Sequence, residues 1–250
     1  RPPGWSADFS TGDFTQWSWW GQGQRHLWGH IAVVDPARFG VPRLRPSSPR
    51  VARMAVTARD AAAGRIHAKL YRRFSVVGPA GERPPRTVSG TYAAWFYVPS
   101  SYRMPRDAAT NLLQFKEAYR GRSDPLWWVQ LGSLAWARDY GGPARWRGAP
   151  RGAPGRPVAF LNYWRNRWRR RVTFMPIPLD RWFEVRAEVR QGRRIAFSID
   201  GRPFDVARAA EHPVSPFRAG STGWIFGVGN YSSAPGTVLY VGAASYAAAS

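Results

Sequence analysis

The sequence predicts an all-β fold, a two-sheet antiparallel β-sandwich of jelly-roll type that takes in residues 1–250 as a single domain. Roughly a dozen short segments carry the alternation, or the β-branched and aromatic residues, that are typical of strands. Turns rich in Gly, Pro and Asp separate them, and hardly any stretch shows the apolar period of a helix. Because neither an internal repeat nor a linker divides the chain, we expect one sandwich whose two ends meet in the same sheet.

The strands expected in the first half of the chain lie between clear turn signals. Asp35 and Pro36 end the first strand, residues 60–64 form a turn, and Pro99 ends the strand that is richest in aromatic residues. Polar residues stand on both faces of the strand expected over 111–119, which fits either an ordinary solvated face or an open sheet face that binds a ligand or does chemistry. The expected strands are 31–34, 51–57, 65–72, 90–98 and 111–119.

The second half of the chain is expected to complete the sandwich. Gln191 and Gly192 join one hairpin, and Asp200 with Gly201 forms a tight turn. Residues 141–157 are dense in Gly, Pro and Arg and are expected to form the longest mobile loop, and residues 205–211 a short helical turn. The expected strands are 126–131, 134–138, 158–164, 170–174, 182–189, 194–199, 224–228 and 238–241.

The charge of the chain points to an acidic partner. The formal net charge is +22, and Lys69 and Lys116 are the only lysines, so nearly all of the positive charge is arginine. Such a chain attracts nucleic acid, anionic lipid surfaces or acidic polysaccharides over long range. The 14 tryptophans offer flat faces that can stack on sugar rings or bases. No nucleic-acid-binding motif is visible, so we expect a monomer without a nucleic-acid partner, and charge alone leaves anionic lipid surfaces and acidic polysaccharides open.

Several other classes are excluded by composition. No apolar run reaches the roughly 18–20 residues of a membrane-spanning helix. Cysteine is absent, which excludes disulfides and thiolate metal sites. His26, His30 and His212 share no metal-ligand spacing, so we expect neither a metal nor another cofactor. The chain begins at Arg1 without a signal peptide, as expected for the processed form of a secreted, extracellular protein.

Three segments carry a resemblance to a known group of enzymes. Residues 224–233 read Trp-Ile-Phe-Gly-Val-Gly-Asn-Tyr-Ser-Ser, residues 114–116 read Gln-Phe-Lys, and residues 65–69 read Arg-Ile-His-Ala-Lys. Together they resemble the strand motifs Tyr-Phe-Lys-Ala-Gly-Asn-Tyr-Asn-Gln, Gln-Ile/Val/Phe-His and Arg-x-Glu-x-Arg of the concanavalin-like jelly-roll polysaccharide lyases. This is the group of alginate, glucuronan and heparin lyases. Residues 9–17, 97–99 and 181–183 are also similar to the group, so the resemblance covers most of the chain.

The resemblance implies a lyase that cleaves a uronate-containing polysaccharide by β-elimination. The acid/base tyrosine of the group falls on Tyr231, and Gln114 and Arg65 match the glutamine and the first arginine of the other two motifs. These matches assign the elimination chemistry to three separate strands.

The same motifs also depart from the pattern of the group. Gly227 stands where the group has lysine, Lys116 replaces the usual histidine, and His67 replaces glutamate. Lys69 keeps the positive charge of the second arginine. Either Lys116 or His67 therefore takes the part of the histidine.

The chemistry of elimination across C4 and C5 gives each residue a role. The carboxylate must be neutralised, a base must remove the C5 proton, and an acid must protonate the departing O4. Arg65 and Gln114 suit the first role, Tyr231 suits the acid and also the base if neighbouring cations lower its pKa, and His67 is a second base. The predicted catalytic residues are Tyr231, His67, Lys116, Gln114 and Arg65, and the predicted substrate-binding residues are Lys69, Tyr71, Asn230, Tyr119 and Trp128.

Two other functions remain open on the sequence. A glycoside hydrolase needs two carboxyl groups facing one bond, and Glu117 with Asp124 or Asp139 is the best pair. A non-catalytic carbohydrate-binding module would keep the tryptophans and need no Tyr231, which could instead cap the core. The basic run 165–171 is either a solvated hairpin or a rim that grips an anionic chain.

Overall fold

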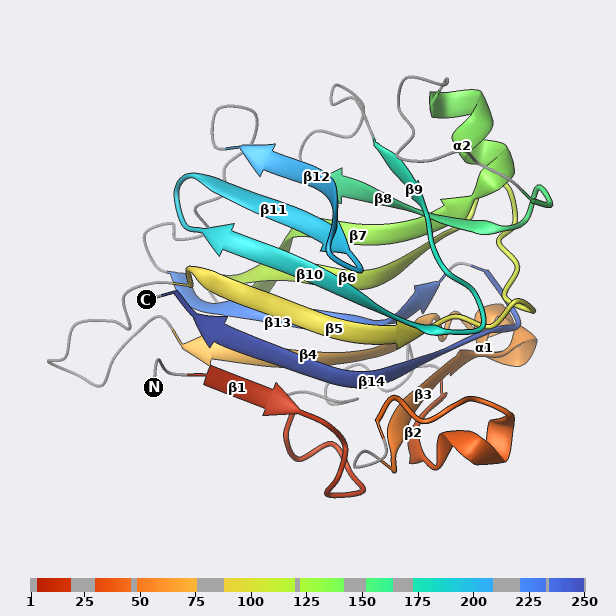
Figure 1. Cartoon of the computed structure of the whole chain (residues 1–250), viewed down its shortest axis with the longest axis horizontal. Coiled ribbons are helices and arrows are strands. Elements are labelled where there is room, and N and C mark those ends of the chain that lie inside the picture. Colours follow the sequence, from red (N-terminus) through yellow and green to blue (C-terminus); the bar gives the residue numbers. More distant parts are fainter. Residues whose placement is uncertain are drawn as a thin grey trace, which may run out of the picture.

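The computed structural model describes residues 4–18, 30–45, 49–75, 88–119, 122–141, 152–163, 173–208, 221–232 and 234–249. The strands form two antiparallel sheets stacked face to face (Figure 1). The predicted all-β jelly-roll sandwich is therefore confirmed. The basic run 165–171 lies outside the described residues, as does most of the loop expected over 141–157.

The larger sheet contains eight strands in the order β12-β11-β10-β5-β14-β3-β2, with β1 beside β14. Its strands are β1 (Gly4–Ala7), β2 (His30–Val34), β3 (Val51–Val56), β5 (Gly90–Tyr97), β10 (Trp182–Arg190), β11 (Arg194–Ile199), β12 (Arg202–Arg208) and β14 (Thr237–Ala248). The pairing of β1 with β14 brings the two ends of the described chain into one sheet, as the sequence predicts.

The smaller sheet has six strands in the order β4-β13-β6-β7-β8-β9. They are β4 (His67–Ser75), β6 (Ala109–Tyr119), β7 (Arg122–Ser133), β8 (Pro157–Tyr163), β9 (Phe174–Pro176) and β13 (Ser221–Ser232). The long strand β13 pairs with β4 on one side and β6 on the other. This order places the three strand motifs, far apart in the sequence, directly beside one another.

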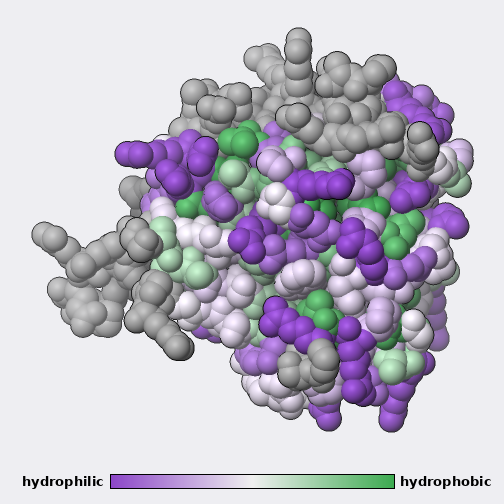
Figure 2. Space-filling view, viewed as in Figure 1, coloured by the Kyte–Doolittle hydropathy of each residue, from purple (hydrophilic) through white to green (hydrophobic). Residues whose placement is uncertain are grey.

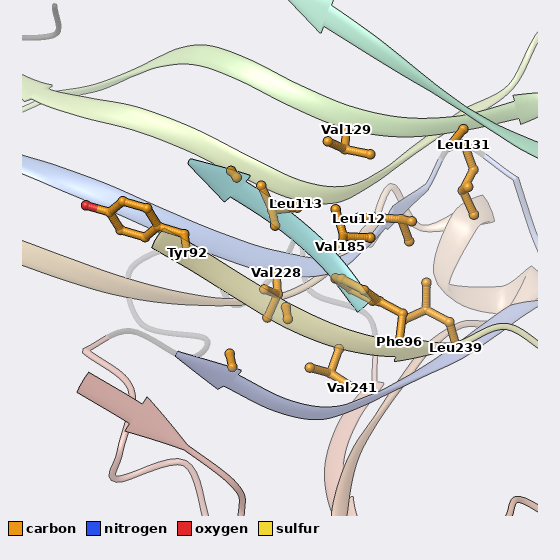
Figure 3. Packing of buried hydrophobic residues seen from close by; sticks show 14 of the residues in the cluster. Tyr92, Phe96, Leu112, Leu113, Val129, Leu131, Val185, Val228, Leu239 and Val241 are labelled. Carbon is orange, nitrogen blue, oxygen red and sulfur yellow. The ribbon is translucent and has the colours of Figure 1, made fainter. Parts of the chain in front are cut away.

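A continuous apolar core fills the space between the sheets (Figure 3). Phe115 of β6 stacks on Trp224 of β13 with ring centroids 4.9 Å apart, and Tyr92 of β5 meets Phe115 from the opposite sheet at 5.1 Å. Each large side chain buried in this way contributes about 1.5–3 kcal/mol. The alternation of the strands thus commits one face of the smaller sheet to the core and leaves the other face for the site.

The outer face of the larger sheet is solvated. Along β10, Val185, Ala187 and Val189 are buried while Arg186 and the alternating charged residues are exposed. Figure 2 shows hydrophilic side chains spread over this view of the molecule instead of gathered at one place. The three strands that carry the motifs, β4, β6 and β13, all belong to the smaller sheet.

Two predicted elements are wrong. Residues 134–138, expected as a strand, belong to the helix α2 (Leu134–Gly141). Leu134 and Ala137 share one face of this helix and pack on Phe160 in a small apolar cluster, so tertiary packing decides the local structure. Residues 205–208, expected in a helical turn, continue strand β12, whose pairing with β11 runs to Arg208.

Other connections agree with the sequence. The hairpin at Gly192 (φ 72°) and the turn at Asp200 and Gly201 (φ 48° and 72°) use the left-handed backbone that those residues tolerate. The expected turn over 60–64 overlaps the short helix α1 (Ala58–Ala62), and the chain has a 3₁₀ turn, η2 (Pro36–Phe39), after β2. No helix within the described ranges is both long and apolar enough to cross a membrane.

Candidate active site

The site lies on the side of the smaller sheet that faces away from the larger sheet, and we call it the site face. Across the β4–β13 pair, His67 stands opposite Tyr231, Lys69 opposite Gly229, and Tyr71 opposite Gly227. Gln114 and Lys116 of β6 and Trp128 of β7 complete the row, because their neighbours in the strands point into the core. The structure thus brings together seven of the ten predicted site residues: His67, Lys69, Tyr71, Gln114, Lys116, Trp128 and Tyr231.

Two glycines of β13 let these side chains lie close to the sheet. A Cβ atom on Gly227 would come 2.6 Å from the Tyr71 ring and 2.9 Å from Cγ of Gln114. A Cβ atom on Gly229 would come 2.6 Å from both the Ala68 carbonyl oxygen and Cβ of Lys69. The Tyr71 ring therefore covers the place where the related motif has lysine, and this explains why residue 227 is glycine.

Lys69 and Lys116 lie against aromatic rings instead of carboxylates. The Lys69 Nζ is 4.4 Å from the centroid of the Tyr231 ring and 5.2 Å from that of the Tyr71 ring. The Lys116 Nζ is 4.8 Å from the centroid of the Tyr71 ring. Among the described residues, neither lysine forms an ion pair. The site face therefore holds positive charge that an anionic ligand can neutralise.

Burial separates the protonation states of the two lysines. Lys69 is only 6% exposed, and this burial, with a smaller contribution from the charge of Lys116, lowers the pKa of Lys69 to about 6. Burial lowers the pKa of Lys116 to about 8. At neutral pH the first side chain is mostly a neutral amine and the second is mostly a cation.

His67 and Tyr231 form an adjacent pair at one end of the site face. Their ring centroids are 4.1 Å apart, and the His67 Nδ1 is buried with no hydrogen-bond partner within the described ranges. Burial, followed by the charges of Lys69 and Lys116, lowers the pKa of His67 to about 3. The His67 imidazole is thus uncharged at neutral pH.

Tyr231 differs from its expected protonation behaviour. The sequence predicted that neighbouring cations would lower the pKa of its phenol, but burial raises this pKa. The cationic effect is weak because the nearest amine, that of Lys69, is itself mostly neutral. Tyr231 is therefore a proton donor at neutral pH, and its role as the base in the resting state is not supported.

Gln114 is fixed by hydrogen bonds on both sides. Its Oε1 accepts from the Trp128 Nε1 at 3.2 Å, and its Nε2 donates to the Tyr71 hydroxyl at 2.9 Å. Gln114 is 3% exposed, and burial also raises the pKa of Tyr71. This chain of contacts orients the amide and holds Tyr71 across β13.

Arg65 is placed differently from the prediction. It precedes β4, and its Nε lies 3.2 Å from the Asp60 Oδ1. The buried Asp60 also caps α1 through Thr57 and lies 3.3 Å from the His30 Nε2. Arg65 is therefore held by a carboxylate at the base of β4, and the positive charge beside Tyr71 on the site face comes from Lys116.

The prediction that Asn230 binds substrate is wrong. Asn230 follows the alternation to the opposite side of β13 from Tyr231 and is completely buried. Its Oδ1 accepts from the Tyr102 hydroxyl at 2.9 Å, and its Nδ2 donates to the Met54 and Thr237 carbonyl oxygens. Its polar atoms are therefore satisfied inside the sandwich. The side chain of Tyr119, another predicted contact, lies outside the part of the chain that the structure describes.

Three amides on the site face were missed. Asn111 pairs in register with Tyr231, and a β-bulge between Asn111 and Leu113 turns its side chain to the site face. Gln130 of β7 donates to the Asn111 Oδ1, and Asn162 of β8 donates to the Gln130 Oε1 at 2.8 Å. These amides extend the site face beside Tyr231. Strict alternation along β6 would have put Leu112 on the site face in place of Asn111, so the sequence pattern did not reveal these amides.

The carboxylates of the glycosidase alternative do not meet on the site face. Glu117 is 2% exposed and pairs in register with Trp224, on the core side of β6. Asp139 lies on α2 and forms an ion pair with Arg106, while the side chain of Asp124 is outside the described part. No group of three or more His, Asp or Glu side chains suited to a metal occurs within the described residues.

Comparisons with known proteins agree with the fold. No protein-family model matches the chain, and no curated protein matches it by sequence. An endo-β-1,4-glucuronan lyase of the fungus Trichoderma reesei superposes with a TM-score of 0.52 and 8% identity, over 98% of this chain and 95% of that one. The Crh5 transglycosylase gives 0.47 and 12% over 99% and 84%, and an alginate lyase of Pseudomonas aeruginosa 0.40 and 12% over 79% and 97%. The first superposition shows that the chain has the jelly-roll fold of the group that its motifs resemble.

Proposed function

We propose that the chain is a polysaccharide lyase that cleaves a uronate-containing polysaccharide by β-elimination on the site face. One observation carries this proposal. Lys69, Lys116, His67 and Tyr231 converge on one partly buried face, and no described carboxylate faces them. Such a site suits a substrate that brings its own carboxylate, whereas a glycosidase would need a carboxyl pair there.

Neutralisation of the substrate carboxylate is the first task. A uronate carboxylate placed over Tyr71 would lie beside the Lys116 ammonium, which is charged at neutral pH. The fixed amide of Gln114 lies on the same strand, two residues away, and can donate a further hydrogen bond. Withdrawal of negative charge from the carboxylate makes the C5 proton more acidic.

Protonation of the leaving group falls to Tyr231. Because burial raises the pKa of Tyr231, the phenol keeps its proton until O4 develops negative charge. The base comes from the unprotonated groups beside it, His67 and Lys69. The missed amides of Asn111, Gln130 and Asn162 supply hydrogen bonds for neighbouring sugar units.

The location of the protein is proposed from its substrate. The +22 charge favours an acidic polymer, and a glucuronan lyase has the same fold. Since acidic polysaccharides of this kind lie outside cells, we propose that the protein is secreted and acts there as a monomer. Size-exclusion chromatography with light scattering checks the monomer.

The activity is tested with glucuronan, alginate and heparin, following the ultraviolet absorbance of the C4=C5 double bond. We expect at least one uronate polymer to give this absorbance. Release of reducing ends from neutral glycans without any absorbance would overturn the proposal in favour of a glycosidase. Binding without either product would indicate a non-catalytic module.

Tyr231→Phe tests the assigned acid. The variant keeps the ring against Lys69 and His67 but lacks the hydroxyl, so we expect kcat to fall about 10²–10⁴-fold with binding of the polymer retained. Unchanged turnover would remove Tyr231 from the mechanism.

A further inference from the structure

The site face offers three groups that could remove the C5 proton, and the structure distinguishes between them. We propose that Lys69 is the catalytic base, and that Lys116 remains the cation that holds the carboxylate of the same sugar. This inference rests on the lyase function proposed above. It assigns different roles to two side chains of the same type on one face of the sheet.

The position of Lys69 is set by the backbone. Its stem lies against Gly229, where a Cβ atom would collide with it, and its amine extends between the rings of Tyr231 and Tyr71. The amine is thus next to the ring of the residue that protonates O4. Lys116 approaches the same Tyr71 ring from β6, on the other side of β13. A uronate lying over Tyr71 would therefore have the two amines on either side of it.

The groups facing Lys69 keep its lone pair free. They are His67 and Tyr71 from its own strand, Tyr231 from β13 and Lys116 from β6, and none of them is a carboxylate. Burial and the charge of Lys116 hold the pKa of Lys69 near 6, so the amine accepts a proton at neutral pH.

The competing bases are weaker. The pKa of His67, about 3, makes its imidazole roughly 10³-fold less basic than the amine of Lys69. The raised pKa of Tyr231 leaves that residue protonated. Lys69 therefore combines the strongest driving force for proton removal with a place beside the acid.

The reaction balances without another reagent. The Lys69 lone pair takes the C5 proton, the C5–H electrons form the C4=C5 double bond, and the C4–O4 bond breaks. O4 leaves with the electron pair of the C4–O4 bond and takes the proton of the Tyr231 hydroxyl. The ammonium of Lys69 then returns a proton to the phenolate, directly or through water, and both residues are restored.

Side-chain NMR tests the protonation state without any substrate. Because the chain has only two lysines, ¹⁵N or ¹³C labelling of lysine gives two side-chain signals, which Lys→Arg variants assign. We expect midpoints near 6 for Lys69 and near 8 for Lys116. A Lys69 midpoint above 9 would overturn the proposal, because the side chain would then be charged at the pH of catalysis.

Substitution tests the chemical role. Lys69→Arg replaces the mostly neutral amine with a cation that cannot accept a proton, so we expect kcat to fall about 10²–10⁴-fold while the polymer still binds. Lys116→Arg is the matched control, since it keeps the charge that its role requires, and we expect a smaller loss. Equal losses in the two variants, or a Lys69→Arg variant within threefold of the wild type, would contradict the assignment.

Chemical rescue separates the base from a structural role. The chain has no cysteine, so Lys69→Cys introduces a unique thiol, which aminoethylation converts to a lysine analogue with a less basic amine. We expect aminoethylation to restore turnover, with the acid limb of the pH profile moved to lower pH. Absence of rescue in a protein that still binds polymer would count against Lys69. If the wild type forms no unsaturated product from any uronate, the lyase function itself fails, whatever the NMR titration shows.

Discussion

At the scale of the residue, Lys69 and Lys116 show how position alone divides one side-chain type between two roles. Both lie against the Tyr71 ring, but the side chain of Lys69 is less exposed than that of Lys116, and the charge of Lys116 also lowers its pKa. Protonating both would place two cations in a poorly hydrated site, so the second proton is the harder one to add. The proposed mechanism therefore uses the amine with the lower pKa as the base and the other as the cation.

The pH dependence of activity should report these two groups. Below about pH 6 Lys69 gains a proton and can no longer act as the base, and above about pH 8 Lys116 loses the charge that holds the carboxylate. We expect kcat/KM to be bell-shaped between these values, and steady-state rates at constant ionic strength measure it. A profile that stays flat from pH 5 to pH 9 would show that neither lysine titrates in the reaction.

The buried amine should also lower stability at acidic pH. The pKa of Lys69 falls from 10.5 in the unfolded chain to about 6 in the folded one, so between these values the unfolded chain binds the extra proton. The free energy of unfolding of the wild type therefore rises with pH across this window. We expect Lys69→Met to be more stable by about 1–3 kcal/mol near pH 6, with a smaller difference near pH 10.

Denaturant unfolding at the two pH values measures this difference. Lys116→Met is the control. The pKa of Lys116 falls only to about 8 in the folded chain, so the effect of this substitution on the free energy of unfolding should depend less on pH. A Lys69→Met variant that is less stable than the wild type at both pH values would mean that the packing of the lysine stem outweighs the burial of its amine.

At the scale of the element, β13 organises the site because it has glycines at the positions where the neighbouring strands carry large side chains. Gly227 and Gly229 let Tyr71, Gln114 and Lys69 lie over the strand from both sides. A side chain on either glycine would push these groups apart. The strand thus determines how far apart the proposed acid, base and cation lie.

Gly227→Ala should disturb this arrangement. Its Cβ would lie 2.6 Å from the Tyr71 ring, which Gln114 holds in place, so we expect a loss of about 1–3 kcal/mol in stability and a lower kcat. Gly223→Ala is the matched control on the same strand, because the nearest atom to its Cβ belongs to the flexible Arg73 side chain. Thermal unfolding and turnover measure both. If the two substitutions had equal effects, the loss would come from replacing any glycine of β13 with alanine, and not from the contact with the Tyr71 ring.

The sequence predicted the elements of the site better than their exact contacts. The period of two along β4, β6 and β13 placed His67, Lys116 and Tyr231 on faces that could meet, and the sheet order confirms that they do. The same period should have excluded Asn230, which is adjacent to Tyr231 and so points the other way. The ion pair of Arg65 with Asp60 was not predictable, because it depends on how α1 packs at the base of β4.

Local departures from the alternation of strands account for the other wrong predictions. The bulge at β6 lets Leu112 and Leu113 both enter the core and turns Asn111 outward, which no simple alternation predicts. The helix α2 forms where the residues also suit a strand, because Leu134 and Ala137 find an apolar partner in Phe160. Tertiary packing decided both cases.

At the scale of the whole molecule, the +22 charge and the site face act at different distances. Charges on the surface act on a polyanion through solvent, where salt screens them over about 10 Å at 0.1 M and about 3 Å at 1 M. The buried groups of the site act on the bound sugar at close range and are screened far less. The two contributions can therefore be separated by ionic strength.

We expect salt to weaken capture of the polymer and to leave the chemical step nearly unchanged. Raising the salt concentration from about 0.05 M to about 0.5 M should increase KM for a uronate polymer at least tenfold, with kcat within about threefold, because only the long-range attraction is screened. Initial rates over a range of polymer concentrations measure both constants, and a short uronate oligosaccharide, which meets less of the surface charge, is the control. A fall in kcat with an unchanged KM would mean that the Lys116 ammonium of the site face is itself screened by salt, contrary to the burial that lowers its pKa.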